Sequence, residues 1–283
     1  MEINSDRKGA AQFAPLSNLH KIVDSTLIIG EKINILNRLI YEAISSKEMS
    51  VITSIALLQV EAGADALDVN LGPEITRGEE IMQEVVTAIQ QYVDVPLCLN
   101  GSPEMIEAGL RVHRGRAIIN GITGDRKRME RLLGLAREND AMIVGMTVPE
   151  RGYAENVEEK CSIAIEIIEQ GKACGISPSD IFLDPIATSF SINSKALVEM
   201  VQIIRLFKEM FSETKTLIGL SNISQGVRKE NRSIINSTTL GILIGAGLDA
   251  AILNPLDKLL IDTTKTAKLL YKNHIYCDAY LCG

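Results

Sequence analysis

The sequence predicts a closed (β/α)8 barrel, because a strand-then-helix pattern repeats eight times along it. The predicted strands are continuously apolar rather than alternating, which is typical of a parallel sheet whose outer face is covered by helices. The eight units are fairly evenly spaced, and 283 residues are enough for one such barrel. A doubly wound open sheet is the alternative, but no G-x-G-x-x-G motif follows the first predicted strand.

Four strands are predicted in the first half of the chain, at residues 26–34, 66–70, 95–100 and 116–120. Apolar residues three or four positions apart follow most of them, and this spacing marks one face of a helix. After the third strand, Ser102 can cap a helix that has Pro103 at its first position. The other predicted helix faces are Val51, Ile55, Leu58 and Ala62; Ile81, Val85, Ala88 and Tyr92; and Met129, Leu132, Leu133 and Ala136.

Four more strands are predicted in the second half, at residues 141–147, 180–185, 217–224 and 250–255. Two further helix faces are Val157, Cys161, Ala164 and Ile168; and Leu197, Val201, Ile204, Phe207 and Phe211. The last two helices are expected over residues 232–246, before Gly247, and over residues 259–271. No linker divides these repeats, so residues 25–283 are expected to form one domain after an irregular leader over residues 1–24.

Charge and hydropathy predict a soluble, cytoplasmic protein. The formal net charge is −7 and no basic cluster stands out, so binding to nucleic acid is not expected. The longest apolar stretch, residues 240–248, is too short to cross a bilayer, which takes about 20 residues. The first 15 residues have no apolar segment of the kind that a signal peptide contains.

The five cysteines form no C-x-x-C pair and are odd in number, which is typical of reduced thiols. Cys161 belongs to an apolar helix face and is expected in the core. His274, Cys277 and Cys282 lack a fourth ligand at the spacing of a metal site, so no metal is predicted.

Polar side chains end nearly every predicted strand. In a parallel barrel, the carboxyl ends of the strands and the loops that follow them build the active site. Each residue taken alone is a common turn former, but together they form a ring of planar hydrogen-bond donors and acceptors. The residues are Glu31, Asn34, Asp68, Asn70, Asn100, Asn120, Thr147, Asp184, Asn222 and Asn254.

This ring suits a nitrogen heterocycle better than other ligands. His20, His113 and His274 lie outside the strand ends, which excludes a Ser-His-Asp arrangement there. No glycine-rich phosphate loop is present, and Lys32 is expected to be solvated or paired rather than to form a Schiff base. Carboxamides with one or two carboxylates can match the N–H and C=O groups of a ring such as a pterin.

Four segments resemble the methyltetrahydrofolate:corrinoid protein methyltransferases, which are pterin-binding enzymes. They read IGEKIN at residues 29–34, LDVNLGP at 67–73, AIINGITG at 117–124 and IGLSNISQ at 218–225. The resemblance covers about residues 26–272. The folate domain of cobalamin-dependent methionine synthase and dihydropteroate synthase are more distant members of the same superfamily.

The resemblance implies a barrel that binds methyltetrahydrofolate and passes a methyl group between folate N5 and the cobalt of a corrinoid on a partner protein. It also implies a homodimer. Asn120 and Asp184 would hold the pterin, and Asn222 would lie beside N5. Because Asn222 does not titrate, the N5 proton would come from water or through Asp184 or Glu31. The rest of the folate site would comprise Glu31, Asn100, Gly219, Ser221, Gln225, Arg232 and Ile252, with Arg232 facing the glutamate tail.

The sequence departs from the family at Asn100, where the third strand usually ends in Asp. Two other readings stay open. Dihydropteroate synthase needs cationic residues late in the chain, but the last strand here reads AILNP. A non-catalytic pterin-binding subunit of a corrinoid complex is the second. The direction of methyl transfer and the identity of the corrinoid protein do not follow from the sequence.

Overall fold

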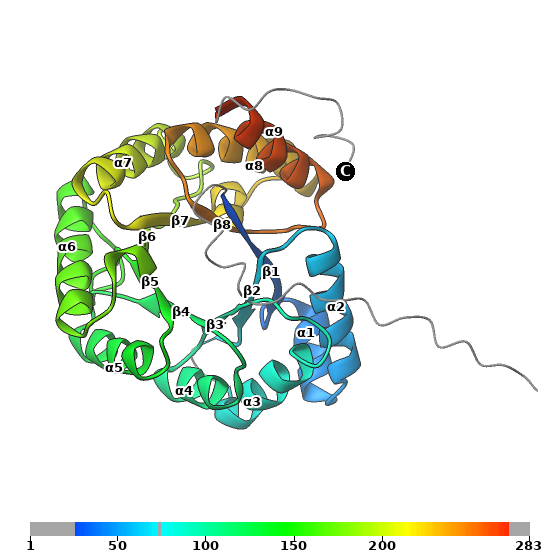
Figure 1. The fold of residues 1–283 in the computed structure, drawn as a ribbon. Helices are drawn as coiled ribbons and strands as arrows, with labels where there is room; N and C mark the ends of the chain where they lie inside the picture. Colours follow the sequence, from blue (N-terminus) through cyan, green and yellow to red (C-terminus); the bar gives the residue numbers. More distant parts are fainter. Residues whose placement is uncertain (1–25, 73–74, 272–283) are drawn as a thin grey trace, which may run out of the picture.

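The computed structural model of the protein describes residues 26–72 and 75–271. Figure 1 shows a ring of strands surrounded by helices. The strands are all parallel and close in chain order from β1 to β8, so the predicted (β/α)8 barrel is confirmed. The predicted leader, His20, His274, Cys277 and Cys282 lie outside the described residues. The strands are β1 Leu27–Asn34, β2 Ala66–Asn70, β3 Leu97–Asn100, β4 Ile118–Ile122, β5 Met142–Met146, β6 Ile181–Asp184, β7 Lys215–Gly219 and β8 Ala250–Leu253.

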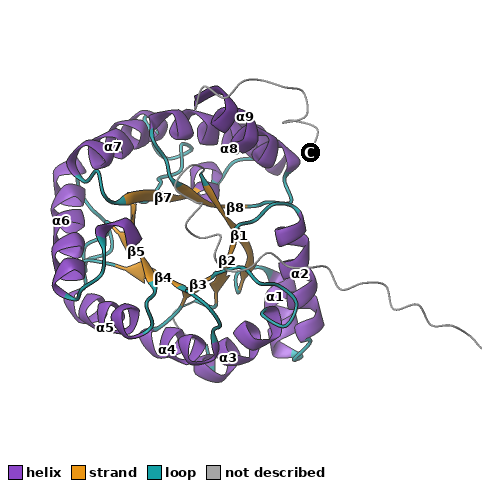
Figure 2. Ribbon diagram, in the orientation of Figure 1, coloured by secondary structure: helices purple, strands orange, loops and turns teal. Residues whose placement is uncertain are grey.

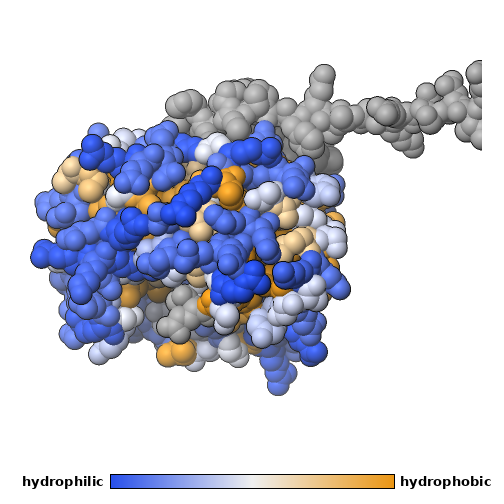
Figure 3. Space-filling model, turned by 90° about the horizontal axis from the view of Figure 1, so that it is seen from below, coloured by the Kyte–Doolittle hydropathy of each residue, from blue (hydrophilic) through white to orange (hydrophobic). Residues whose placement is uncertain are grey.

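Helices cover the outside of this sheet (Figure 2). They are α1 Arg38–Ser45, α2 Met49–Glu61, α3 Gly78–Ile89, α4 Pro103–Val112, α5 Arg126–Glu138, α6 Val157–Ala173, α7 Ala196–Met210, α8 Lys229–Ala246 and α9 Lys258–Tyr271. Two 3-10 helices are described as well, η2 Pro178–Asp180 and η3 Leu220–Ser224. No described helix has the length and apolar character needed to span a membrane. The face of the molecule in Figure 3 is mainly hydrophilic, as expected for helices whose outer sides meet water.

Helix α1 was not predicted. It has eight residues, which is too short for an apolar period to repeat clearly. Its N-cap Asn37 accepts a hydrogen bond from the Leu39 N–H, and Ile40, Ala43 and Ile44 are its buried residues.

Two predicted helix faces were wrong, wholly or in part. In α2 the buried residues are Ile52, Thr53, Ala56 and Gln59, whereas Leu58 is 51% exposed. Apolar residues surround α2 on several sides, so the pattern could not select the buried one. On the α3 face Val85 is buried, but Tyr92 is 51% exposed. The predicted α5 face is confirmed, because Met129, Leu132, Leu133 and Ala136 are all buried.

Alternate residues of each strand point into the barrel, and this explains where the polar strand ends lie. A buried inner cluster contains Cys98, Ile118, Phe182, Leu217 and Ala250, one residue from each of five strands. Successive strand side chains point to opposite faces, so the residue two positions later points inward again, nearer the carboxyl end. Those residues are Asn100, Asn120, Asp184, Gly219 and Ile252.

A β-bulge in β1 contains Glu31. The register between β1 and β2 shifts between Gly30 and Ile33. Gln59, which is fully buried on α2, accepts a hydrogen bond from the Lys32 N–H at 2.9 Å through its Oε1. This side chain supplies an acceptor for a backbone N–H of the bulged segment.

Gly30 leaves the space that Gln59 occupies. A Cβ at this position would lie 2.6 Å from Gln59 Oε1 and 3.1 Å from Leu67 Cδ2. We expect Gly30→Ala to lower the free energy of unfolding by about 1–3 kcal/mol, because it displaces the acceptor of the Lys32 N–H. Urea denaturation measures this change.

Gly134→Ala is the matched control. Gly134 lies inside α5, and nothing lies within 4 Å of the Cβ that would be added there. This variant should be neutral or gain up to about 1 kcal/mol from helix propensity. Equal effects of the two substitutions would contradict the role assigned to Gly30.

Candidate functional site

Asparagines from four neighbouring strands lie level with one another at the carboxyl end of the barrel. Asn34 pairs in register with Asn70, Asn70 with Asn100, and Asn100 with Asn120. Asp184 ends β6, on the far side of the closed ring from β2. The mouth therefore carries an arc of carboxamides and a carboxylate across from it.

Asn120 is held by a carboxylate deeper in the barrel. Its Nδ2 donates to Asp68 Oδ1 at 3.2 Å, and both side chains are buried. Because the amide N–H side faces Asp68, the carbonyl oxygen of Asn120 is the group left for a ligand. Burial raises the pKa of Asp68 to about 6, although hydrogen bonds from Asn120 and Cys98 lower it. Asp68 was noted as a strand-end residue but was not included in the predicted folate site.

Asp184 is the most strongly perturbed carboxyl group at the mouth. Burial raises its pKa to about 7, against the lowering effects of the Ile186 N–H and the charge of Lys160. The Ile186 N–H donates to Asp184 Oδ1 at 2.7 Å, and the Thr147 hydroxyl donates to the Asp184 carbonyl at 3.2 Å. Ile186 has a φ of +56°, which costs a β-branched residue roughly 1–2 kcal/mol.

Glu31 of β1 and Ser221 of η3 are joined by hydrogen bonds at the barrel mouth. The Ser221 hydroxyl lies 2.9 and 2.7 Å from the two carboxylate oxygens of Glu31 and donates to them. Burial raises the pKa of Glu31, while this hydrogen bond and Lys32 lower it. The contact ties η3 to β1 across β8.

Asn222 lies beyond the strand that was expected to present it. The prediction extended the seventh strand over residues 217–224, but β7 ends at Gly219 and η3 follows. Ser and Asn side chains favour such turns because they compete for backbone hydrogen bonds. The Asn222 side chain nevertheless returns to the strand end, since its Nδ2 is 3.1 Å from the position of a Cβ on Gly219. Gln225 Nε2 donates to Asn222 Oδ1 at 3.1 Å, which leaves the amide N–H2 of Asn222 to donate.

The remaining predicted residues differ in position. Ile252 is half-buried and packs against the inner cluster. Asn100 is half-buried at its strand end. Gln225 and Arg232 are exposed. Arg232 lies in the first turn of α8, and its Nε donates to the Val227 carbonyl, just before the helix, at 2.9 Å. Arg232 therefore lies at the rim, apart from the buried carboxylates and amides.

Arg128, which the sequence did not single out, braces two of the strand exits. From α5, its Nε donates to the Gly121 carbonyl at 2.7 Å and its Nη2 to the Gly101 carbonyl at 3.0 Å. Gly101 and Gly121 directly follow Asn100 and Asn120 in the chain. No sequence signal marked Arg128, because it is one of several charged residues on a polar helix.

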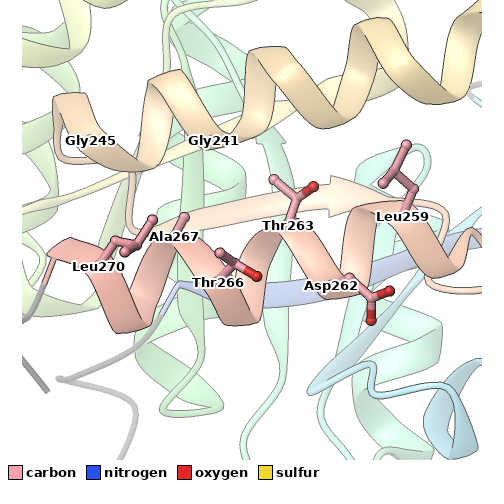
Figure 4. A pocket seen from close by; sticks show the side chains of 8 residues that line it. All are labelled: Gly241, Gly245, Leu259, Asp262, Thr263, Thr266, Ala267 and Leu270. Carbon is pink, nitrogen blue, oxygen red and sulfur yellow. The ribbon is translucent and has the colours of Figure 1, made fainter. Parts of the chain in front are cut away.

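A separate apolar groove lies on the outside of the barrel, between α8 and α9 (Figure 4). Its volume is about 550 Å³, and Gly241 and Gly245 of α8 face Thr263, Ala267 and Leu270 of α9 across it. None of the strand-end amides or carboxylates lines it. We place the candidate site at the barrel mouth, where buried groups with perturbed pKa values converge.

Comparison with known proteins identifies the family of this chain. A family model described as pterin binding enzyme matches residues 31–254. A methylcorrinoid:tetrahydrofolate methyltransferase from Eubacterium limosum is 27% identical over 259 residues, which cover 90% of this chain and 94% of that protein. Methionine synthase from Mycobacterium leprae (strain TN) is 29% identical over 242 residues, which cover 81% of this chain but 20% of that protein.

Solved structures give the fold independently. The dihydropteroate synthase of Yersinia pestis superposes with a TM-score of 0.64 at 18% identity, covering 88% of this chain and 93% of that one. A second dihydropteroate synthetase structure, with a bound product, has a TM-score of 0.66, also at 18% identity, and covers 88% of this chain and 95% of that one. At this level of identity the likeness establishes the barrel and not the reaction.

Proposed function

Because the chain belongs to the pterin-binding enzyme family, we propose that it transfers a methyl group between N5 of tetrahydrofolate and the cobalt of a corrinoid on a partner protein. The similarity to a methylcorrinoid:tetrahydrofolate methyltransferase over nearly the whole of both chains supports this activity. The folate is the small-molecule substrate, and the corrinoid is a substrate presented by the partner.

The observation that carries the proposal is the neutral amide of Asn222 above the end of β7. Its Nδ2 is free to donate, because Gln225 engages its Oδ1. When the methyl group leaves folate N5, the nitrogen lone pair becomes a better acceptor and takes up a proton. A fixed donor that binds this developing charge more strongly than the ground state accelerates the reaction.

The other buried groups match the pterin ring. The Asp184 carboxylate can accept from the 2-amino and ring N–H groups, and the Asn120 carbonyl oxygen can accept a further N–H. Glu31, with its raised pKa, can relay the proton that Asn222 itself does not supply. A reduced corrinoid brings its own nucleophile, cobalt(I), so the protein needs to provide none.

Exposed apolar side chains on the mouth loops suit a protein partner. Leu36 after β1 is 90% exposed, and Ile192 after β6 is 84% exposed. Tyr153 after β5 and Leu256 after β8 are exposed as well. Apolar side chains on loops around a catalytic opening favour docking of a second protein, here the one that carries the corrinoid.

The alternatives are less well supported. Dihydropteroate synthase needs cationic residues late in the chain for its pyrophosphate leaving group, whereas β8 and the residues after it read AILNP at 251–255, so this activity is disfavoured. A non-catalytic pterin-binding subunit would not need a free donor beside N5.

Both directions of transfer use the same site, so we infer that the corrinoid partner sets the physiological direction. A homodimer is expected, and sedimentation measures it.

Folate binding should depend on pH through Asp184. Its pKa is about 7 in the free protein, and the carboxylate is the form that accepts from the pterin N–H groups. As pH falls below 7 the carboxyl is protonated, so the Kd for methyltetrahydrofolate should rise by up to about tenfold per pH unit. Calorimetric titration between pH 5.5 and 8.5 measures this change. A flat profile would contradict the role of Asp184.

A further inference from the structure

Lys160 of α6 contacts the backbone of Pro185, the residue that follows Asp184. We propose that Lys160 is a positioning residue, which holds the corner after β6 and keeps the Asp184 carboxylate ready for the pterin. The inference rests on the proposed function, because it assigns Asp184 to folate recognition. Lys160 would touch neither the folate nor the corrinoid and would act through Asp184.

The first support is a contact between α6 and the exit of β6. Lys160, in the first turns of α6, donates from Nζ to the Pro185 carbonyl at 2.6 Å, across 25 positions of sequence. The side chain is half-buried, and burial lowers its pKa. A lysine that directs its ammonium inward at a backbone carbonyl is engaged in holding that segment, since an unconstrained lysine extends to water.

The second support is the strain in the corner that Lys160 holds. Ile186 adopts a φ of +56°, which a β-branched residue rarely does, directly after Pro185. The Ile186 N–H in this corner donates to Asp184 Oδ1 at 2.7 Å. Thr147 holds the Asp184 carbonyl on one side and Lys160 holds the Pro185 carbonyl on the other. Strain of this kind persists only where surrounding contacts fix the segment, and it gathers at functional sites.

The third support is charge. From α6, Lys160 acts on Asp184 and favours its ionised form. Burial lowers the pKa of Lys160, while the charges of Asp184 and of Glu199 on α7 raise it. On the β5 side the neighbour is the neutral hydroxyl of Thr147. Removal of the Lys160 charge therefore raises the pKa of Asp184, and a larger share of the protein carries the protonated carboxyl at pH 7.

Three variants test the proposal through the Kd of 5-methyltetrahydrofolate, measured by calorimetry between pH 5.5 and 8.5. Lys160→Met should weaken binding at pH 7 at least tenfold and should move the pH at which binding declines upward. The rate of methyl transfer at saturating folate should change less than threefold. Lys160→Arg, which keeps the charge and a donor, should bind close to wild type. Lys172→Met, an exposed lysine on the same helix, is the matched control and should bind like wild type.

The outcomes separate the two proposals. A wild-type protein that does not bind methyltetrahydrofolate would overturn the proposed function, and the role of Lys160 with it. A wild type that binds, together with a Lys160→Met variant of unchanged Kd and pH profile, would overturn the role of Lys160 alone. If Lys160→Met does not fold, Lys160→Gln keeps a donor without charge, and its pH profile must still move upward. A lower melting temperature with an unmoved profile would mean a structural role only.

Discussion

Replacing Asn222 with Ala is expected to lower the rate of methyl transfer by roughly a hundredfold while the barrel stays folded, which is the loss typical of removing one donor from a developing charge. The Asn222 Nδ2 lies above Gly219, and no side chain in the described part of the chain accepts a hydrogen bond from it, whereas its Oδ1 accepts from Gln225. The substitution removes this donor and the acceptor of the exposed Gln225 side chain. The barrel should stay folded, because the Asn222 side chain is half-buried on a short 3-10 helix.

Transfer should be followed at saturating folate, so that the loss appears in kcat rather than in KM. Asn231→Ala, an exposed asparagine of α8, is a suitable control. If Asn222→Ala transfers methyl groups at a near-normal rate, the donor role of Asn222 is wrong. Loss of folate binding without loss of kcat would assign Asn222 to ground-state binding instead.

Asp184→Asn is expected to weaken folate binding by about 1.5–3 kcal/mol, or roughly 10- to 150-fold, because a charge-assisted acceptor becomes neutral. The corner after β6 should survive, since the amide oxygen can still accept from the Ile186 N–H at the place of Asp184 Oδ1. The variant should also lose the decline in affinity below pH 7.

Calorimetry with 5-methyltetrahydrofolate at pH 7.5 and 6 measures both effects. Asp94→Asn is the matched control, because Asp94 is exposed at the opposite end of the barrel, before β3. Wild-type affinity in Asp184→Asn would remove Asp184 from the folate site.

The barrel was predictable because a buried parallel sheet leaves a clear mark in sequence. Each strand of such a sheet has apolar residues on both faces, and a helix follows each strand. The alternation of apolar strands and amphipathic helices can therefore be recognised in a single sequence. The polar strand ends followed from the same logic, since inward positions such as Asn120 and Asp184 lie two residues beyond inner core residues. The buried side of α2 could not be predicted from the sequence, because apolar residues occur on several sides of that helix. Gln59 is buried there and accepts a hydrogen bond from the bulged segment of β1.

Contacts between distant segments account for what the sequence missed. Asn222 was expected on a strand, but its position depends on a turn that folds its amide back over Gly219. Lys160 and Arg128 sit on helices among other charged residues, and their roles come from backbone carbonyls 25 and 27 positions away. Nothing in local composition distinguishes such residues from solvated ones.

Mixing the purified protein anaerobically with 5-methyltetrahydrofolate and cob(I)alamin tests the central claim most directly. The account predicts loss of the cobalt(I) absorbance in wild type, with methylcobalamin and tetrahydrofolate formed in equal amounts, and the same loss roughly a hundredfold more slowly in Asn222→Ala. Folate binding without any loss of cobalt(I), with free cobalamin or with corrinoid proteins, would contradict it and identify a non-catalytic pterin-binding subunit.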